Sequence, residues 1–342
     1  MKALVLEKYS NFVYKDVPVP EIGPKEVLIR VRACCVCGSD VHGMDGSTGR
    51  RIPPVIMGHE ASGVIDKVGS AVTGIQEGDR VTFDSTVYCD KCEYCARGDI
   101  NLCNNRRVLG VSCPEYRYDG AFAEFVAVPG RIVYKLPENV TFEQASMIEP
   151  LSVAFHAIGR TRISGGTAVV IGCGTIGLLT AQLLSARGFE KIIATDIMEE
   201  KLLQAKKLGI PYVINSLKGD LIEEVLRQTG GEGADLSLDA VGVDASVQDA
   251  IGVLRKGGES VLIGNLKPDV NIPLQKVVTK QLSIFGSCAS AGEYPECLAL
   301  IAEGKIDVDS LISKIVPLSE GNEWIHKVYS QEPGLSKIVV IP

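Results

Sequence analysis

Two patterns of apolar and polar positions divide the chain near residue 150. Up to that point, short runs rich in apolar and β-branched residues, among them EVLIRVRA (26–33) and AFAEFVAVP (121–129), are separated by Gly, Pro and Asp. Runs of this kind, bounded by turn-forming residues, are typical of β-strands. The pattern therefore predicts a compact, barrel-like β domain over residues 1–150.

From residue 151 to about 286, strand-like segments alternate with segments of helical length. KIIATD (191–196) is followed by EEKLLQAKKLG (199–209), and DLIEEVLRQTG (220–230) is followed by ADLSLDAVG (234–242). This alternation indicates an α/β domain with parallel strands joined by crossover helices. The remaining segment, 287–342, contains one helical stretch and a terminal strand, and we expect it to return to the first domain.

Composition and charge exclude several functional classes. The 342 residues carry a net charge of −7 without any block of Lys or Arg, which argues against a nucleic-acid partner. No stretch approaches 18 uncharged apolar residues, and the first residues show no basic segment followed by an apolar one. We therefore expect a cytoplasmic protein without a membrane partner. In that reducing compartment, clustered members of the eleven cysteines favour metal binding over disulfides.

A polar loop carries four cysteines at close spacing. Cys89, Cys92, Cys95 and Cys103 have two, two and seven residues between them. Four thiolates fill the tetrahedral coordination of zinc and leave no open position, which predicts a structural zinc site. An iron–sulfur cluster is the competing interpretation, but the last spacing is too long and no Pro follows Cys103.

A glycine-rich turn follows the apolar run TAVVI. Gly172, Gly174 and Gly177 form GxGxxG between a predicted strand and a predicted helix, the context that a dinucleotide-binding turn requires. Asp196 ends the next strand, where a carboxylate can accept hydrogen bonds from both ribose hydroxyls of adenosine and repel a 2′-phosphate. NAD is therefore favoured over NADP, although Asp196 can also cap the following helix.

A second group of potential metal ligands is spread along the first domain. Cys37 lies in CVCGSDVH, His59 and Glu60 lie in GHE, and Glu149 lies where the two patterns meet. One thiolate, one imidazole and one or two carboxylates make an open zinc site, unlike the closed four-cysteine site.

These motifs, in this order along almost the whole chain, resemble the zinc-dependent medium-chain dehydrogenases, and within them the polyol branch that includes sorbitol dehydrogenase. The resemblance implies a GroES-like β-barrel catalytic domain, a Rossmann doubly wound parallel-sheet domain and two zinc ions per chain. It further implies hydride transfer between a secondary alcohol of a polyol or sugar derivative and NAD, giving a ketose. A homo-oligomer, dimer or tetramer, is expected.

The resemblance also assigns roles to individual residues. Cys37, His59 and Glu60 match the catalytic zinc ligands, and Glu149 matches a carboxylate that binds the zinc directly or through water. Ser39 matches the hydroxyl that accepts the substrate proton, and His42 matches the histidine that passes it on. The expected cofactor-binding residues are Gly172, Gly174, Ile176, Gly177, Asp196 and Lys201.

The substrate is less defined than the chemistry. After the SDVH box this chain has Gly43 and Met44 where sorbitol dehydrogenase has an aromatic residue, and Ser287 and Cys288 follow the last Rossmann strand. The pairs Arg50–Arg51 and Arg106–Arg107 are either exposed surface arginines or a clamp for a phosphorylated or acidic sugar. A general zinc alcohol dehydrogenase is the alternative within the family. A redox sensor using Cys34, Cys35 and Cys37 is the alternative from another class.

Overall fold

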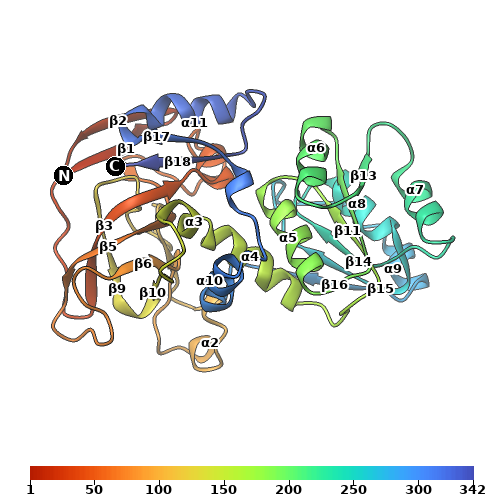
Figure 1. The fold of residues 1–342 in the computed structure, drawn as a ribbon, viewed down its shortest axis with the longest axis horizontal. Helices are drawn as coiled ribbons and strands as arrows, with labels where there is room; N and C mark the ends of the chain where they lie inside the picture. The colour runs from red at the N-terminus through yellow and green to blue at the C-terminus, as the bar shows by residue number, and fades with distance from the viewer. The chain divides into compact units, whose positions relative to one another are not determined.

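The computed structural model describes all 342 residues, which form two units. Unit 1 contains residues 1–149, 290–304 and 308–342, and unit 2 contains residues 150–289 and 305–307 (Figure 1). The C-terminal segment beyond residue 289 thus belongs mostly to unit 1. None of the helices has the length and apolar character needed to cross a bilayer.

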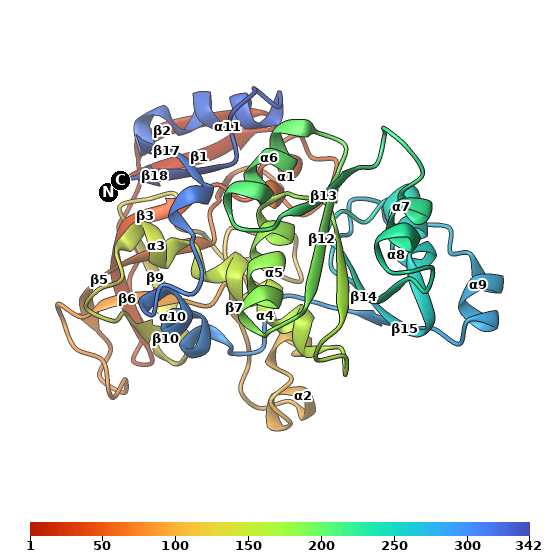
Figure 2. The ribbon, with the colours of Figure 1, turned by 45° about the vertical axis from the view of Figure 1, so that its right-hand side comes forward.

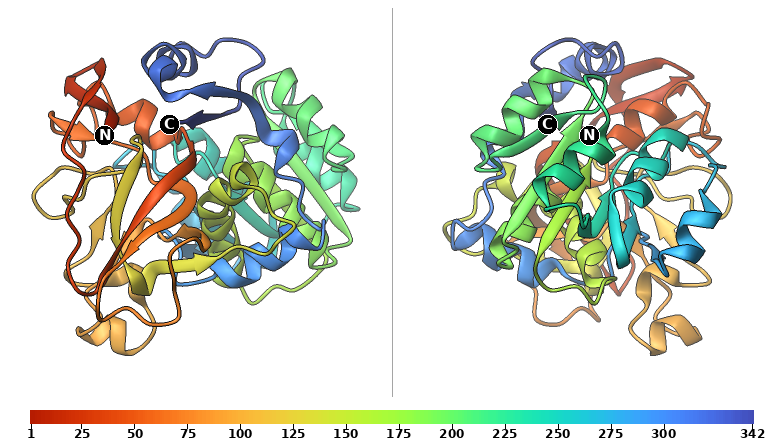
Figure 3. Two further views of the ribbon diagram at one scale, coloured as in Figure 1. Left: turned by 60° about the vertical axis from the view of Figure 1, so that its left-hand side comes forward. Right: turned by 90° about the vertical axis from the view of Figure 1, so that its right-hand side faces the viewer.

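Unit 1 is built on mostly antiparallel sheets, with one parallel pair, β17 and β18. Its largest sheet has seven strands in the order β10-β6-β5-β3-β18-β17, with β9 also paired to β3, and a smaller sheet has the order β2-β1-β4. The strands are β1 (Lys2–Lys8), β2 (Asn11–Asp16), β3 (Glu26–Cys35), β4 (Val55–Ile56), β5 (Glu60–Val68), β6 (Arg80–Phe83), β7 (Thr86–Val87), β8 (Arg107–Val108), β9 (Phe125–Pro129), β10 (Val133–Lys135), β17 (Ile312–Pro317) and β18 (Lys337–Ile341). The terminal strand β18 lies beside β3, far from it in sequence (Figure 3, left).

Short helices connect these strands, and one apolar core fills the unit. The helices are α1 (Gly38–Gly43), α2 (Glu93–Ala96), α3 (Phe142–Ser146), α10 (Tyr294–Ala302) and α11 (Gly321–Tyr329). The core joins alternate residues of β3 and β5 to Phe83, Phe122 and the C-terminal Ile338 and Val340. The short apolar runs are thus explained by strands such as β1, β3 and β18, which bury consecutive residues and therefore both faces.

Unit 2 is a single parallel sheet in the order β13-β12-β11-β14-β15-β16, with helices between the strands (Figure 2). The strands are β11 (Thr167–Ile171), β12 (Lys191–Asp196), β13 (Tyr212–Asn215), β14 (Ala234–Asp239), β15 (Leu254–Leu262) and β16 (Ser283–Gly286). The helices are α4 (Ile148–Gly159), α5 (Thr175–Ala186), α6 (Glu199–Lys207), α7 (Leu221–Gln228), α8 (Asp244–Gly252) and α9 (Leu274–Thr279). In chain order the strands run 3-2-1-4-5-6, the doubly wound Rossmann arrangement, so the predicted fold class is confirmed.

Candidate active site and metal centres

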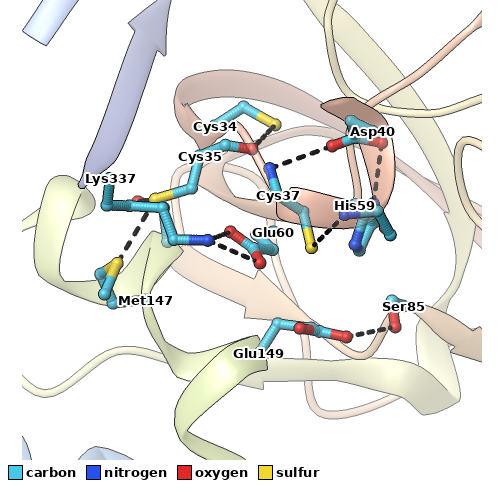
Figure 4. A network of polar contacts seen from close by, with 12 residues as sticks. Cys34, Cys35, Cys37, Asp40, His59, Glu60, Ser85, Met147, Glu149 and Lys337 are labelled. Atoms are coloured by element: carbon cyan, nitrogen blue, oxygen red, sulfur yellow. Dashed lines mark hydrogen bonds and ion pairs between the residues drawn. The ribbon is translucent and has the colours of Figure 1, made fainter. Parts of the chain in front are cut away.

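The ends of two paired strands bring Cys37, His59 and Glu60 together. β3 and β5 pair antiparallel with Cys35 opposite Glu60, so the turn after β3 places Cys37 near the start of β5. The ligand atoms of Cys37, His59 and Glu60 all lie within 4.8 Å of one another (Figure 4). His59 and Glu60 are buried, and Cys37 is half-buried. This donor set fits a zinc ion that keeps one position open.

The buried carboxylate of Asp40 contacts this group. One oxygen accepts a hydrogen bond from the Cys37 N–H at 3.2 Å, and the other lies 3.4 Å from Nδ1 of His59 in an ionic contact. Burial alone raises the pKa of Asp40, but the charges of His59 and Arg51 outweigh burial and lower it to about 2. A carboxylate beside Nδ1 favours the tautomer that leaves Nε2 free as a ligand. Asp40 therefore fits the role of orienting a metal-binding histidine.

Glu60 is also held by a lysine from the far end of the chain. Lys337, the first residue of β18, donates from Nζ to both carboxylate oxygens, at 2.9 and 2.6 Å. Their side chains are 4% and 1% exposed. Burial lowers the pKa of Lys337, but Glu60 and the neighbouring thiols raise it overall, so the pair is charged. Glu60 thus shares its negative charge between Lys337 and any bound cation.

Glu149 lies close to the three candidate ligands but outside their group. It occupies the first turn of α4, and its Oε1 accepts a hydrogen bond from Ser85 Oγ at 3.0 Å. Burial raises the pKa of Glu149, while the charge of His59 lowers it and that of Glu60 raises it further. Ser85 therefore fixes a carboxylate within electrostatic reach of the metal ligands.

Helix α1 carries Ser39 and His42, the two residues expected to handle the substrate proton. Ser39 is exposed next to Cys37, and its N–H donates to the Cys37 sulfur at 3.4 Å. His42 is exposed in the last turn of the same helix. Met44, which with Gly43 stands after the SDVH box in place of an aromatic residue, is fully buried in the core of unit 1. Its long apolar side chain is accounted for by packing.

The four arginines suggested as an anion clamp differ in their surroundings. Arg51 is 5% exposed and pairs with Asp40, so its guanidinium is already neutralised. Arg106 donates to the Asn101 carbonyl at 2.6 Å. Only Arg50 and Arg107 are exposed. Neither alternative holds for Arg51, which is not an exposed surface residue and whose charge is already paired with Asp40.

The four-cysteine loop converges as its spacing predicts. The sulfurs of Cys89, Cys92, Cys95 and Cys103 lie within 4.8 Å of one another, and those of Cys92 and Cys95 are 3.5 Å apart. The N–H groups of Cys89 and Asn105 donate to the Cys103 sulfur at 3.2 and 3.4 Å. Several hydrogen bonds, the largest from the Lys91 amide, lower the pKa of Cys89 to about 6, whereas burial raises that of Cys103 to about 11. Amide groups directed at sulfur stabilise thiolates, so the loop fits a structural zinc ion.

The glycine-rich turn leaves open space where a pyrophosphate would bind. A Cβ at Gly177 would lie 1.8 Å from the Gly172 carbonyl oxygen, and one at Gly172, where φ is +92°, would lie 2.5 Å from Val241. A Cβ at Gly174 would meet no atom within 4 Å. Gly174 directly precedes the 12-residue helix α5, whose N-terminal N–H groups and dipole favour an anion. The turn therefore fits a dinucleotide.

The carboxylate of Asp196 faces this turn. It accepts hydrogen bonds from the N–H groups of Cys173 at 2.7 Å and Met198 at 2.9 Å. Each carboxylate oxygen keeps a further lone pair for a ribose hydroxyl. Ile176 and Lys201, the other expected cofactor residues, lie in the first turns of α5 and α6. Asp196 thus both braces the turn and remains available to a cofactor.

The adjacent thiols Cys34 and Cys35 do not have the properties of redox sensors. Both are fully buried in β3, and no disulfide joins any of the eleven cysteines. Burial raises the pKa of Cys34 well above its usual value and that of Cys35 to about 12. Reactive thiols need a lowered pKa and exposure, so these two behave as small core residues.

The structure adds Asp40 and Lys337 to the residues named from the sequence, and it gives Arg51 a buried position that the sequence did not indicate. Asp40 stands inside the SDVH box and shows a weak signal as the third residue after Cys37. A lysine beginning the otherwise apolar run KIVVIP is a sign of a buried ion pair. Arg51, in the polar segment GRRIPP, carries no signal of burial.

Comparison with known proteins agrees with this geometry. Residues 23–138 match the alcohol dehydrogenase GroES-like domain, and residues 175–303 match the zinc-binding dehydrogenase domain. The chain is 36% identical over 336 residues to D-xylulose reductase A of Aspergillus oryzae, covering 95% of this chain and 93% of that protein.

Two solved structures cover the full length. Galactitol-1-phosphate dehydrogenase from Escherichia coli has a TM-score of 0.92 and 29% identity, covering 100% of both chains. A zinc-binding dehydrogenase from Sinorhizobium meliloti, solved with NADP, has a TM-score of 0.91 and 31% identity, covering 100% of this chain and 99% of that one. The chain therefore belongs to the zinc-dependent medium-chain dehydrogenases, in the branch that includes the D-xylulose reductases.

Proposed function

We propose that the protein oxidises a secondary alcohol of a sugar alcohol or sugar derivative to a ketose, with zinc and NAD. The observation that carries this proposal is the convergence of Cys37, His59 and Glu60 beside Ser39, with Asp40 orienting the histidine. A thiolate–imidazole–carboxylate donor set with an exposed hydroxyl beside it suits an alcohol that must lose a proton as hydride leaves its carbon.

The roles of the side chains follow from their positions. Cys37, His59 and Glu60 would hold the catalytic zinc, which supplies Lewis acidity toward the alcohol oxygen. Ser39 accepts the alcohol proton, and exposed His42, on the same helix, passes it toward solvent. Glu149, held by Ser85, binds the zinc or its water. Cys89, Cys92, Cys95 and Cys103 would hold a second zinc that stabilises their loop.

We further propose NAD as the preferred cofactor. The support is Asp196, whose carboxylate is placed at the turn and would repel a 2′-phosphate. The relative solved with NADP shows that the family also contains users of the phosphorylated cofactor. Membership of the family therefore does not decide between NAD and NADP, and the preference of this protein for NAD depends on individual side chains such as Asp196.

The cofactor proposal is tested by kcat/KM for NAD and NADP in the wild type, Asp196→Ala and Asp196→Asn. Loss of charge-assisted bonds to the ribose should weaken use of NAD by roughly 2 to 3 kcal/mol in the alanine variant and narrow or invert the preference. Cys173 and Met198 donate to different oxygens of Asp196, so Asp196→Asn can accept from only one of them; it removes the charge while keeping part of the bracing of the turn. A wild type that uses NADP as efficiently as NAD would contradict the proposal.

The substrate class is tested by an NAD-reduction screen over polyols, sugar phosphates, aldonic acids, ethanol and 1-butanol. Hydroxyls flanking the reacting carbon should each contribute about 1 to 3 kcal/mol, because a site that binds them leaves polar groups unpaired when they are missing. We expect polyhydroxy substrates to exceed the simple alcohols by about 100-fold or more. Equal or better activity on ethanol or 1-butanol would instead identify a general alcohol dehydrogenase.

The cytoplasmic location and the homo-oligomer of two or four chains stay predictions. Cell fractionation tests the location. Sedimentation equilibrium of the zinc-loaded protein tests the assembly.

A further inference from the structure

A buried arginine joins the proton-handling hydroxyl to the carboxylate behind the metal site. Arg51 is 5% exposed, and its Nη2 donates to Ser39 Oγ at 3.1 Å and to Asp40 Oδ1 at 3.3 Å. Its apolar stem packs where Gly43 has no side chain, since a Cβ there would lie 3.2 Å from Arg51 Cδ. The glycine after the SDVH box thus makes room for Arg51.

We propose that Arg51 is a positioning residue that holds the Ser39 hydroxyl in its proton-accepting orientation and couples it through Asp40 to His59. The proposal rests on the proposed function, in which Ser39 receives the alcohol proton. Arg51 does not itself exchange a proton in the proposed reaction. It acts through Ser39 and Asp40.

The chemistry of the guanidinium gives the hydroxyl a direction. A serine hydroxyl has one proton to donate and two lone pairs, whereas a guanidinium has only donors and stays protonated. With Nη2 donating to one lone pair, the Ser39 O–H cannot point at Arg51. It must release its own proton elsewhere as it accepts the alcohol proton on the remaining lone pair, and Ser39 is exposed to solvent. Arg51 therefore selects the orientation needed for relay.

The same guanidinium stabilises the carboxylate that contacts the metal site. Asp40 is fully buried, and an unpaired charge there would be costly. The contacts of Asp40 to the Cys37 N–H and to His59 depend on its staying ionised and in place. The buried guanidinium of Arg51 thus contacts both Ser39, which accepts the proton, and Asp40, which orients His59.

A double-mutant cycle between Arg51 and Ser39 tests the proposal. Arg51→Met removes the donor and keeps an apolar stem, and Arg50→Met is the matched control because Arg50 is the exposed neighbour. Each change is made with Ser39 intact and with Ser39→Ala, in zinc-loaded protein. In the protein with Ser39 intact, we expect Arg51→Met to lower kcat by about 10- to 100-fold and to change KM by less than about 3-fold. In the Ser39→Ala background, the same change should lower kcat by less than about a further 3-fold, because the hydroxyl that Arg51 orients is already missing. Measured with an uncharged substrate, for which an anion clamp has no role, the Arg50→Met control should change neither kcat nor KM.

Three further measurements separate positioning from general damage. Zinc content is determined for each variant, and a loss of activity fully explained by lost zinc would overturn the proposal. An equal loss of kcat on Arg51→Met with Ser39 and with Ser39→Ala would also overturn it. Crystal structures should show the Ser39 hydroxyl in more than one rotamer in Arg51→Met and in one rotamer in Arg50→Met, and a single unchanged rotamer in both would also overturn it. Arg51→Lys keeps the charge and should restore part of kcat.

The proposed function and this inference fail separately. If the wild type oxidises simple alcohols and no polyol, the substrate assignment is wrong, and the cycle is run with the alcohol that is turned over. If Arg51→Met does not fold, Arg51→Lys replaces it, with an expected loss in kcat of about 3- to 10-fold that disappears in the Ser39→Ala background.

Discussion

Replacing Asp84 by asparagine should make the stability of unit 1 less dependent on pH. Asp84 follows β6 and is 1% exposed. Its Oδ1 accepts a hydrogen bond from the Thr86 N–H at 2.8 Å, while its buried Oδ2 has no partner. Burial raises the pKa of Asp84 to about 8, with the charge of Glu149 adding to the shift and the bond from Thr86 opposing it. The folded protein therefore keeps a proton at neutral pH that the unfolded chain has released.

The sign and size of the effect follow from proton binding. An aspartate in an unfolded chain has a pKa near 3.9, so the unfolded state binds fewer protons than the folded state between about pH 4 and pH 8. Stability is highest below the unfolded pKa and falls as pH rises toward 8. At about 1.4 kcal/mol per pKa unit, the whole decline between pH 4 and pH 8 amounts to roughly 5 to 6 kcal/mol, and the part between pH 5 and pH 8 to roughly 3 to 4 kcal/mol. The side-chain amide introduced by Asp84→Asn can still accept from Thr86 through its oxygen but has no proton to lose.

Trp324 provides the assay. It is the single tryptophan and lies in α11, which belongs to unit 1 as Asp84 does, so its fluorescence reports this unit alone during urea unfolding. We expect Asp84→Asn to match the wild type at pH 5 and to exceed it at pH 8, with a difference on the order of 3 kcal/mol. Asp119→Asn, at an exposed position in the same unit, is the control and should show no such dependence. If the free energies of unfolding of Asp84→Asn and the wild type differ by the same amount at pH 5 and at pH 8, the reasoning is refuted.

Metal analysis should find two zinc ions per chain, and Cys89→Ser should lose only one, because the four-cysteine site is separate from the open one. A chelator should remove the zinc of the open site first, and a single zinc in fully active protein would contradict the assignment. Gly177→Ala should abolish NAD binding measured by calorimetry, since its methyl group would lie 1.8 Å from the Gly172 carbonyl oxygen; binding as in the wild type would show that the turn adapts. Lys337→Met should lower the free energy of unfolding of metal-free protein by about 3 to 5 kcal/mol, because it leaves Glu60 buried and unpaired. Zinc should restore part of this loss. An unfolding curve unchanged from that of the wild type would argue against a charged pair between Lys337 and Glu60.

The fold was predictable because its elements repeat a local pattern. The runs that became β11, β12 and β14 are apolar and separated by helical segments, so periodicity alone indicated a parallel sheet, and the comparisons confirm the family. The candidate ligands were also visible, since zinc sites use few residue types at close spacing. Their roles as ligands and proton carriers stay predictions.

Other features depend on contacts that no local pattern contains. Lys337 meets Glu60 only because β18 pairs with β3, and the two residues are 277 positions apart. Arg51 is buried because Asp40 and the missing side chain of Gly43 make a place for it. A polar segment such as GRRIPP predicts a solvated loop, and only the tertiary structure reverses that prediction.

The discontinuity of unit 1 has a consequence for how the chain is made. Unit 2 is almost continuous, at residues 150–289, whereas unit 1 needs β18 from residues beyond 336. During synthesis, unit 2 can fold while the first 149 residues still lack β18, the strand that pairs with β3 in their largest sheet. Until Lys337 emerges, Glu60 has no cation to balance it in the growing chain. The proposed metal site is therefore among the last parts of the protein to mature, although its candidate ligands Cys37, His59 and Glu60 are among the first to be translated.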